Sequence, residues 1–167
     1  MNNIILIGMP AVGKSTIGVI LAKILGYDFI DSDLMIQKQE DCLLKEIIKE
    51  KGIEGFWKIE EDVNRQIQGN HLIIATGGSA VYGKKAMEHF KEIGTIIYLK
   101  EEYEILKSRL SNVKGRGVTL RDGQTLRELY DERSILYESY ADITVNENAR
   151  GVEETIQEII SLIGSLA

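Results

Sequence analysis

A glycine-rich segment near the start of the chain has the composition of a phosphate-binding loop. It reads Gly8-Met9-Pro10-Ala11-Val12-Gly13-Lys14-Ser15, which satisfies the pattern G-x-x-x-x-G-K-[ST]. Glycines at both ends let the backbone turn tightly, so that successive N–H groups converge on a phosphate. A helix beginning near Lys14 adds the positive end of its dipole. We expect Lys14 to reach the β- and γ-phosphates of a nucleotide and Ser15 to bind Mg²⁺. A chance glycine-rich turn is the alternative, and the flanking strand and helix patterns argue against it.

Two carboxylates follow the second apolar run of the chain, in the sequence Asp31-Ser32-Asp33. In open α/β sheets, ligands bind at the carboxyl ends of the strands, which is where this pair falls. Asp33 could accept the proton of an attacking hydroxyl, or could orient that hydroxyl. The alternative is that both residues only cap a helix that begins near Leu34. Beside a phosphate-binding loop, we favour the functional interpretation.

The loop motif predicts a nucleotide-binding site but does not indicate which reaction the protein catalyses. The chain has no Asn-Lys-x-Asp motif of the kind that reads guanine in GTPases, and no strand ends in the acidic pair expected of a motor ATPase. Residues 107–133 hold seven basic and four acidic residues, although the whole chain has a net charge of −6. A basic segment in an acidic protein indicates an anionic ligand, although solvated helix faces produce such runs too.

The elements that must position these residues alternate between short apolar runs and amphipathic stretches. This alternation is typical of βαβ units and a parallel sheet. We predict strands at 4–7, 27–31, 72–75, 95–99 and 142–145. A helix is expected after the phosphate loop, ending at Gly26, and another at the end of the chain. The apolar positions of these two helices are Ile17, Ile20, Leu21, Ile24 and Leu25, and Val152, Ile156, Ile159, Ile160 and Ile163.

Two segments interrupt this alternation of strand and helix patterns. Residues 43–68 are charged and helical, with breaks predicted near Gly52 and Gly55. Residues 111–123 have few core positions and three glycines, which predicts a mobile loop that serves either as a lid or as a loose connection.

The bulk composition describes one soluble domain. The chain has 167 residues, 44% hydrophobic and 28% charged, which is ordinary for a globular protein. The acidic net charge argues against nucleic acid as a partner, and no apolar run is long enough to span a membrane. The single cysteine, Cys42, excludes an internal disulfide and fits a reducing compartment. We expect a cytoplasmic monomer.

Together, these residues resemble the shikimate kinase family over nearly the whole chain. The resemblance rests on the loop ending Gly13-Lys14-Ser15-Thr16, the Asp31-Ser32-Asp33 pair, Gly77-Gly78 after the third strand, and Arg133 in Arg133-Ser134-Ile135-Leu136-Tyr137. It implies a three-layer α/β P-loop kinase fold with a five-stranded parallel sheet in the order 2-3-1-4-5. It also implies a single domain, 1–167, with a core of residues 1–33, 69–110 and 124–167, a helical substrate-binding subdomain at about 34–68 and a mobile lid at about 111–123.

The resemblance also implies an activity, the transfer of the γ-phosphoryl group of ATP to shikimate. The products would be shikimate 3-phosphate and ADP, in aromatic amino acid biosynthesis. Catalysis would fall to Lys14, Asp33 and Arg116, the last being the lid arginine. The nucleotide would be bound by Ala11, Val12, Gly13, Lys14, Ser15, Thr16, Arg109, Arg116 and Arg150. The metal would be held by Ser15 and Asp31, and the substrate by Asp33, Trp57, Gly77, Gly78 and Arg133.

Simpler interpretations stay open for several of these residues. Gly77-Gly78 could be an ordinary strand-to-helix turn, and Arg116 and Arg133 could be solvated surface charges.

The sequence departs from the family pattern mainly in its acceptor half. The family reads G-E-x-x-F-R-x-x-E where this chain reads Gly52-Ile53-Glu54-Gly55-Phe56-Trp57-Lys58-Ile59-Glu60, so Trp57 replaces an arginine that binds the substrate carboxylate. An indole cannot form the two parallel hydrogen bonds of a guanidinium, and Lys58 points about 100° away around the helix. Ala11 and Ser79 replace glycines, and Gly117 and Ile135 replace prolines. Two alternatives therefore remain: a kinase of the same fold for a different polyol or hydroxy-acid acceptor, and a nucleotide-binding regulatory protein without catalysis.

Overall fold

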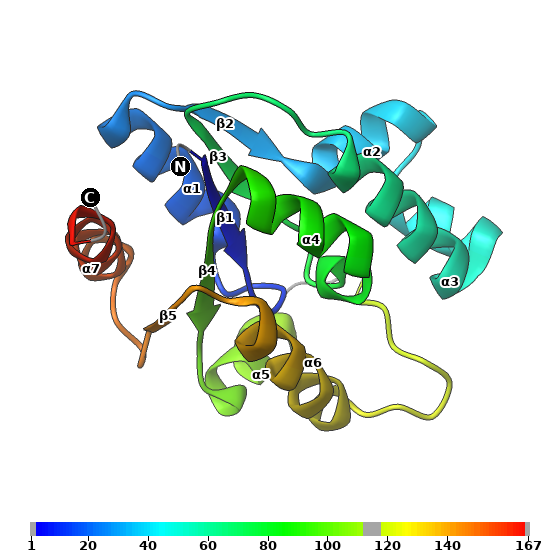
Figure 1. The fold of residues 1–167 in the computed structure, drawn as a ribbon. Coiled ribbons are helices and arrows are strands. Elements are labelled where there is room, and N and C mark those ends of the chain that lie inside the picture. Colours follow the sequence, from blue (N-terminus) through cyan, green and yellow to red (C-terminus); the bar gives the residue numbers. More distant parts are fainter. Residues whose placement is uncertain (1–2, 112–117, 166–167) are drawn as a thin grey trace.

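The computed structural model describes residues 3–111 and 118–165, and its centre is a five-stranded parallel sheet (Figure 1). The strands are β1 (Asn3–Ile7), β2 (Asp28–Asp31), β3 (Leu72–Ala75), β4 (Gly94–Lys100) and β5 (Ile143–Asn146). They pair in the order β2-β3-β1-β4-β5, which confirms the predicted order. No strand end differs from its prediction by more than one residue. Because all strands run in one direction, their carboxyl ends meet at one edge of the sheet.

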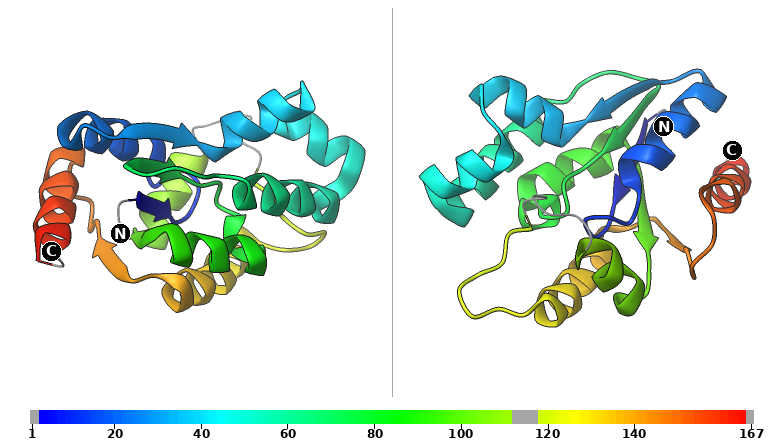
Figure 2. Two further views of the ribbon diagram at one scale, coloured as in Figure 1. Left: turned by 45° about the horizontal axis from the view of Figure 1, so that its top comes forward. Right: turned by 180° about the vertical axis from the view of Figure 1, so that it is seen from behind.

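Helices cover both faces of the sheet and give the three layers that were expected (Figure 1, Figure 2). Helices α1 (Lys14–Leu25) and α7 (Val152–Gly164) lie on one face, and α4 (Lys84–Ile93) and α6 (Leu126–Tyr140) lie on the other. The short α5 (Tyr103–Ser111) packs beside α6, and a 3₁₀ turn, η1, spans Ala80–Tyr82. Helix α1 ends on Gly26 in the left-handed conformation, as predicted.

The core is deepest at β1, the central strand. All five of its residues are buried, and Ile73, Ile74, Ile96 and Ile97 of the neighbouring strands are completely buried. A parallel strand covered on both faces needs apolar side chains at successive positions rather than at alternate ones. The continuous apolar runs of the sequence meet this requirement.

Helices α2 (Ser32–Glu40) and α3 (Leu44–Arg65) project beyond the carboxyl end of β2 (Figure 1). They share a small apolar cluster, separate from the main core, formed by Ile36, Ile47, Phe56 and Val63. The predicted break at Gly52 is confirmed, because this residue has a φ of 72° inside α3. The break predicted near Gly55 is wrong: this glycine continues the helix, because an isolated glycine costs a helix only about 1 kcal/mol relative to alanine.

Of the predicted lid, residues 112–117 lie outside the described residues, and Arg116 lies among them. Residues 118–125 run to the start of α6 without regular secondary structure apart from a turn. None of the helices in the described ranges is long and apolar enough to cross a bilayer.

Candidate active site

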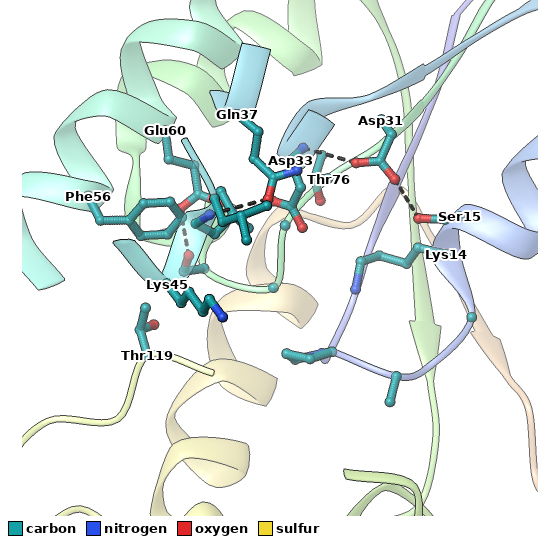
Figure 3. Close-up of a pocket in the computed structure, with 18 of the residues that line it drawn as sticks. Lys14, Ser15, Asp31, Asp33, Gln37, Lys45, Phe56, Glu60, Thr76 and Thr119 are labelled. Atoms are coloured by element: carbon teal, nitrogen blue, oxygen red, sulfur yellow. Dashed lines mark hydrogen bonds between the residues drawn. The ribbon is translucent and has the colours of Figure 1, made fainter. Parts of the chain in front are cut away.

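A cleft of about 520 Å³ opens where β1, β2 and β3 end. One side is formed by the phosphate loop and the start of α1, and the other by α2, α3 and the loop after β3 (Figure 3). Thr119 and Arg133 complete the wall from the segment before α6 and from α6 itself. The predicted site residues that line the cleft are Ala11, Gly13, Lys14, Ser15, Thr16, Asp31, Asp33, Gly77, Gly78 and Arg133.

The phosphate loop is bent by three residues with positive φ. Gly8 has a φ of 146° and Gly13 a φ of 101°. A Cβ atom on Gly8 would lie 2.6 Å from the carbonyl oxygen of Leu99, so this position has no room for a side chain. Ala11, which replaces a glycine of the family, keeps a φ of 67°. The backbone bend is therefore preserved at the cost of holding an alanine in the left-handed region.

Lys14 is held against the loop that precedes it. Its side chain is buried, and Nζ donates hydrogen bonds to the carbonyl oxygens of Gly8 at 2.7 Å and Met9 at 2.8 Å. Helix α1 begins at Lys14, and Gly13 offers no side chain to cap its first turn. Helix α1 has twelve residues, and no side chain caps the backbone N–H groups of its first turn. These N–H groups, together with the buried ammonium group of Lys14, fit the terminal phosphates of a nucleotide.

Ser15 and Asp31, the two residues predicted to hold a metal ion, are in direct contact. The Ser15 hydroxyl donates to Asp31 Oδ2 at 2.7 Å. The other oxygen, Oδ1, accepts from the backbone N–H groups of Asp33 at 3.0 Å and Leu34 at 3.3 Å. Asp31 is therefore also the N-cap of α2. A hydroxyl and a carboxylate are suitable ligands for Mg²⁺, which is bound in nucleotide sites by few protein groups together with the phosphates.

The loop after β3 is glycine-rich because carboxyl groups and a ring approach it closely. A Cβ on Gly77 would lie 2.5 Å from Glu60 Oε1 and 2.7 Å from Asp33 Oδ1. A Cβ on Gly78 would lie 2.7 Å from Cδ of Pro10. Two hydrogen bonds fix the loop: Gly77 N–H donates to Ser32 Oγ at 3.2 Å, and the Tyr137 hydroxyl donates to the Gly78 carbonyl at 2.6 Å. The loop after β3 is therefore both a turn and a fixed wall of the cleft.

Glu60 is a buried acid that the sequence reasoning did not place in the site. It is 1% exposed, and its Oε2 accepts a hydrogen bond of 2.6 Å from the Ser79 hydroxyl. Burial raises the pKa of Glu60 to about 8, although the Ser79 hydrogen bond opposes the shift, and the nearby charge of Asp33 adds to it. Ser79, which replaces a glycine of the family, thus supplies a donor to this carboxyl group.

Arg133 enters the cleft from α6. It is 1% exposed, so the interpretation of this residue as a solvated surface charge is wrong. Its Nη2 donates to Thr119 Oγ1 at 2.8 Å, and among the described residues its Nε has no hydrogen-bond partner. A buried guanidinium group that lines a cleft is suited to binding an anionic ligand.

Within the described ranges, four predicted residues do not line this cleft. Val12 is buried in the main core. Arg109 contacts the phosphate loop, where Nη1 donates to the Ala11 carbonyl at 3.2 Å, and its Nη2 lies 3.5 Å from Glu101 Oε2. Arg150 forms an ion pair with Glu158 of α7.

Trp57 is the fourth of these residues, and it lines a separate hollow with Arg121 and residues 51–54. Its indole stacks on the ring of Tyr82 at a centroid distance of 4.2 Å, and the Arg121 guanidinium lies over it at 5.4 Å. Its side chain thus joins α3 to η1 and to the segment before α6.

The cleft also contains residues that the sequence reasoning did not assign to the site: Pro10, Gln37, Leu43, Leu44, Lys45, Phe56, Glu60, Thr76, Ser79 and Thr119. Phe56 and Glu60 are four residues apart and so share one face of α3, which was a readable signal. Thr76 could have been found as the residue directly after a predicted strand. Gln37, Lys45 and Thr119 carry no such signal, because their place depends on how α2, α3 and the segment before α6 fold over the sheet.

A three-layer α/β fold with a phosphate loop, a hydrogen-bonded serine–aspartate pair beside it and a cleft lined by a buried arginine is typical of a P-loop phosphotransferase. The shikimate kinase family model matches residues 10–164. A shikimate kinase of Persephonella marina is 32% identical over 98% of this chain and 99% of its own length, and one of Clostridium botulinum (strain Okra) is 37% identical over 96% and 95%. The chain belongs to the shikimate kinase family, whose members are phosphotransferases that act on a hydroxyl group.

Solved structures agree with this family. The structure described as shikimate kinase from Acinetobacter baumannii in complex with shikimate superimposes with a TM-score of 0.91 at 32% identity, covering 99% of this chain and 94% of that one.

Proposed function

We propose that this protein transfers the γ-phosphoryl group of ATP to a hydroxyl group of shikimate, giving shikimate 3-phosphate and ADP. The observation that carries the proposal is that one cleft joins the phosphate loop to Asp33, Gly77, Gly78 and the buried Arg133. Family membership and the similarity to a shikimate-bound kinase support the choice of acceptor.

The donor half of the reaction would rest on the phosphate loop. Lys14 would bind the terminal phosphates and balance the charge that develops during transfer. Ser15 and Asp31 would hold Mg²⁺, which when bound neutralises charge on the phosphates; their 2.7 Å hydrogen bond supports this pairing. We also keep the proposal that Arg116 acts at the phosphates, and that Arg109 and Arg150 lie beside the base.

The acceptor half would rest on Asp33, the loop after β3 and Arg133. Asp33 would orient the acceptor hydroxyl and take its proton as the bond to phosphorus forms. Arg133 would bind the acceptor's carboxylate, and the wall at Gly77 and Gly78 would set the position of its ring. The closeness of Asp33 to Gly77, where only a hydrogen atom fits, supports a tightly bounded acceptor position.

We further propose that residues 34–68 act as the acceptor-binding subdomain of a single domain, and that residues 111–123 act as its lid. The separate apolar cluster of α2 and α3 supports the first part of this division. We expect the protein to work as a monomer in the cytoplasm, without nucleic acid or membrane partners.

A kinase for a different polyol or hydroxy acid is the second candidate, and Trp57 at the family's arginine position favours it. A nucleotide-binding protein without catalysis is the third. An assay of ADP release with shikimate, with a panel of other polyols and hydroxy acids, and without acceptor separates the three. We expect shikimate-dependent release with a KM between about 1 μM and 1 mM. Release only with another acceptor of the panel would favour the second candidate, and nucleotide binding without release would favour the third.

Two variants test the proposed roles in the same assay. Lys14→Ala should lower kcat by about 10²–10³-fold because it removes a charge that stabilises the transferring group. Asp33→Asn should lower kcat by about 10²–10⁴-fold because an amide cannot accept the hydroxyl proton. Near-normal turnover in a folded variant would contradict the assigned role.

A further inference from the structure

Lys45 is a cation in the acceptor half of the cleft that the proposed reaction does not yet use. It lies in the first turn of α3, lines the cleft and is exposed to solvent. Figure 3 shows its side chain entering the cleft from the side of Phe56, Glu60 and Thr119, with its amino end directed toward the middle of the cleft. Among the described residues, no acidic side chain forms an ion pair with it.

The position of Lys45 does not help its helix. A positive charge in the first turn of a helix is unfavourable, because the N-terminal end of the dipole is itself positive. The neighbouring Glu46 already serves the helix, since its Oε2 accepts the backbone N–H of Leu43 at 2.8 Å. The ammonium group of Lys45 and the helix end therefore reinforce each other as a positive region facing the cleft.

A second cation, Arg133, lines the cleft and binds Thr119, which Figure 3 shows on the side from which Lys45 enters. Arg133 is 1% exposed and is anchored to Thr119, and its Nε has no hydrogen-bond partner among the described residues. Lys45 and Arg133 come from different helices, α3 and α6, and both side chains reach the one cleft.

The indole of Trp57 does not take part in this half of the cleft. It faces Tyr82 and Arg121 and lines a separate hollow. Lys58, the residue next to it, does not line the cleft either. Along α3, Lys45 is thus the basic side chain that lines the cleft.

We propose that Lys45 determines acceptor specificity by binding the acceptor's carboxylate together with Arg133. The inference rests on the proposed function, because it concerns the acceptor of that reaction. The ammonium group donates to one carboxylate oxygen and the guanidinium to the other, and the charge of the acid is balanced from both sides. This arrangement selects an acidic acceptor although the family's arginine is replaced by Trp57.

The test is the kinetics of Lys45→Met, which keeps the length of the side chain and removes its charge. We expect KM for shikimate to rise about tenfold, with kcat and KM for ATP changed less than about twofold. With the carboxamide of shikimate as acceptor, wild type and Lys45→Met should have equal kcat/KM. Lys45→Arg should keep a KM close to that of wild type, and Lys58→Met, the matched control on α3, should leave all constants unchanged.

The possible outcomes separate this inference from the proposed function. If wild type phosphorylates shikimate and Lys45→Met keeps its KM, the inference is overturned and the function stands. The inference is also overturned if Lys45→Met loses as much kcat/KM with the carboxamide as it loses with shikimate, because the lysine would then not recognise the carboxylate. A wild-type protein without shikimate turnover would contradict the proposed function, and this inference with it.

Discussion

At the scale of single residues, the cleft places two carboxyl groups, Asp33 and Glu60, against the same glycine. Both approach the position that a Cβ of Gly77 would occupy. Two ionised carboxylates at such close quarters repel each other, so a proton on one of them stabilises the pair. Glu60 is the completely buried partner, and its pKa is raised to about 8. Asp33 can then carry the charge that accepting a proton requires.

The variant Glu60→Gln tests whether Glu60 is the protonated member of this pair. Glu60 binds its proton more tightly in the folded state than in the unfolded chain, so its contribution to stability is complete below pH 4.5 and is lost as the pH rises through about 8. Wild type should lose at most about 4 kcal/mol from this group between pH 5 and pH 8. The variant should lack that loss, because an amide does not titrate.

Urea unfolding at several pH values measures the difference between the two proteins. Other groups whose pKa is raised, such as Glu147 with a pKa of about 7, are present in wild type and in the variant, so their effects cancel in the comparison. Parallel stability curves for wild type and Glu60→Gln would contradict a protonated Glu60.

At the scale of elements, Asp31 connects the start of α2 to the start of α1. Its Oδ1 caps α2 and its Oδ2 accepts from Ser15, so the capping role is present and the proposed metal role uses the other oxygen. The two roles can be separated by substitution, because asparagine is as good an N-cap as aspartate but lacks the charge.

Asp31→Asn should therefore fold with nearly wild-type stability, within about 0.5 kcal/mol, but require about 10–100-fold more Mg²⁺ for half-maximal activity. Asp31→Ala should show the same metal effect and in addition lose about 1 kcal/mol of stability, because it removes the cap. Mg²⁺ titrations of activity and urea unfolding provide the two measurements. An unchanged Mg²⁺ requirement in Asp31→Asn would remove this residue from the metal site.

Trp57 is a second case in which one residue connects elements. It stacks on Tyr82 of η1 and lies under Arg121, and Arg121 also pairs with Glu132 of α6 at 3.1 Å. Trp57 thus forms a contact between α3 and the segment before α6. Because Trp57 is the single tryptophan of the chain, the tryptophan fluorescence reports on the surroundings of this one indole.

Arg121→Ala should shift the tryptophan emission to longer wavelength, because the indole loses its cover, and should lower stability by about 1 kcal/mol. Arg127→Ala is the matched control, since this arginine lies over Tyr103 and Tyr130 instead. An emission spectrum that is the same in Arg121→Ala and wild type would show that the cation does not cover the indole in solution.

At the scale of the whole molecule, the cleft lies between the sheet-based core and the pair α2 and α3, which has its own apolar cluster. A ligand that contacts both parts stabilises the folded state by mass action. MgADP at about 100 times its dissociation constant should raise the free energy of unfolding by about 2.7 kcal/mol. Thermal unfolding with EDTA in place of Mg²⁺ should show a smaller effect, and Lys14→Ala should show almost none. Equal stabilisation by ADP with and without Mg²⁺ would contradict the metal position at Ser15 and Asp31.

Much of this molecule was predictable from the sequence because its signals are local. The apolar runs marked the strands within one residue at each end, and the bend at Gly52 followed from the glycine itself. The phosphate loop was readable because its chemistry depends on consecutive residues, and that loop lies where the sequence placed it. The mistaken break at Gly55 shows the limit of such signals, since neighbouring contacts decide whether a lone glycine ends a helix.

The acceptor half depended on tertiary structure, because its residues come from separate elements. Neither the burial of Arg133 nor the raised pKa of Glu60 follows from a local pattern, since both result from α3 and α6 closing over the loop after β3. The direction of Trp57 and Lys45 is set by the same packing, which turns the indole toward Tyr82 and leaves the lysine facing the cleft. The sequence alone determined the fold, the family and the phosphate chemistry, because short-range patterns encode them. Only the tertiary structure decided which charged side chains line the cleft, because that depends on contacts between residues far apart in the chain.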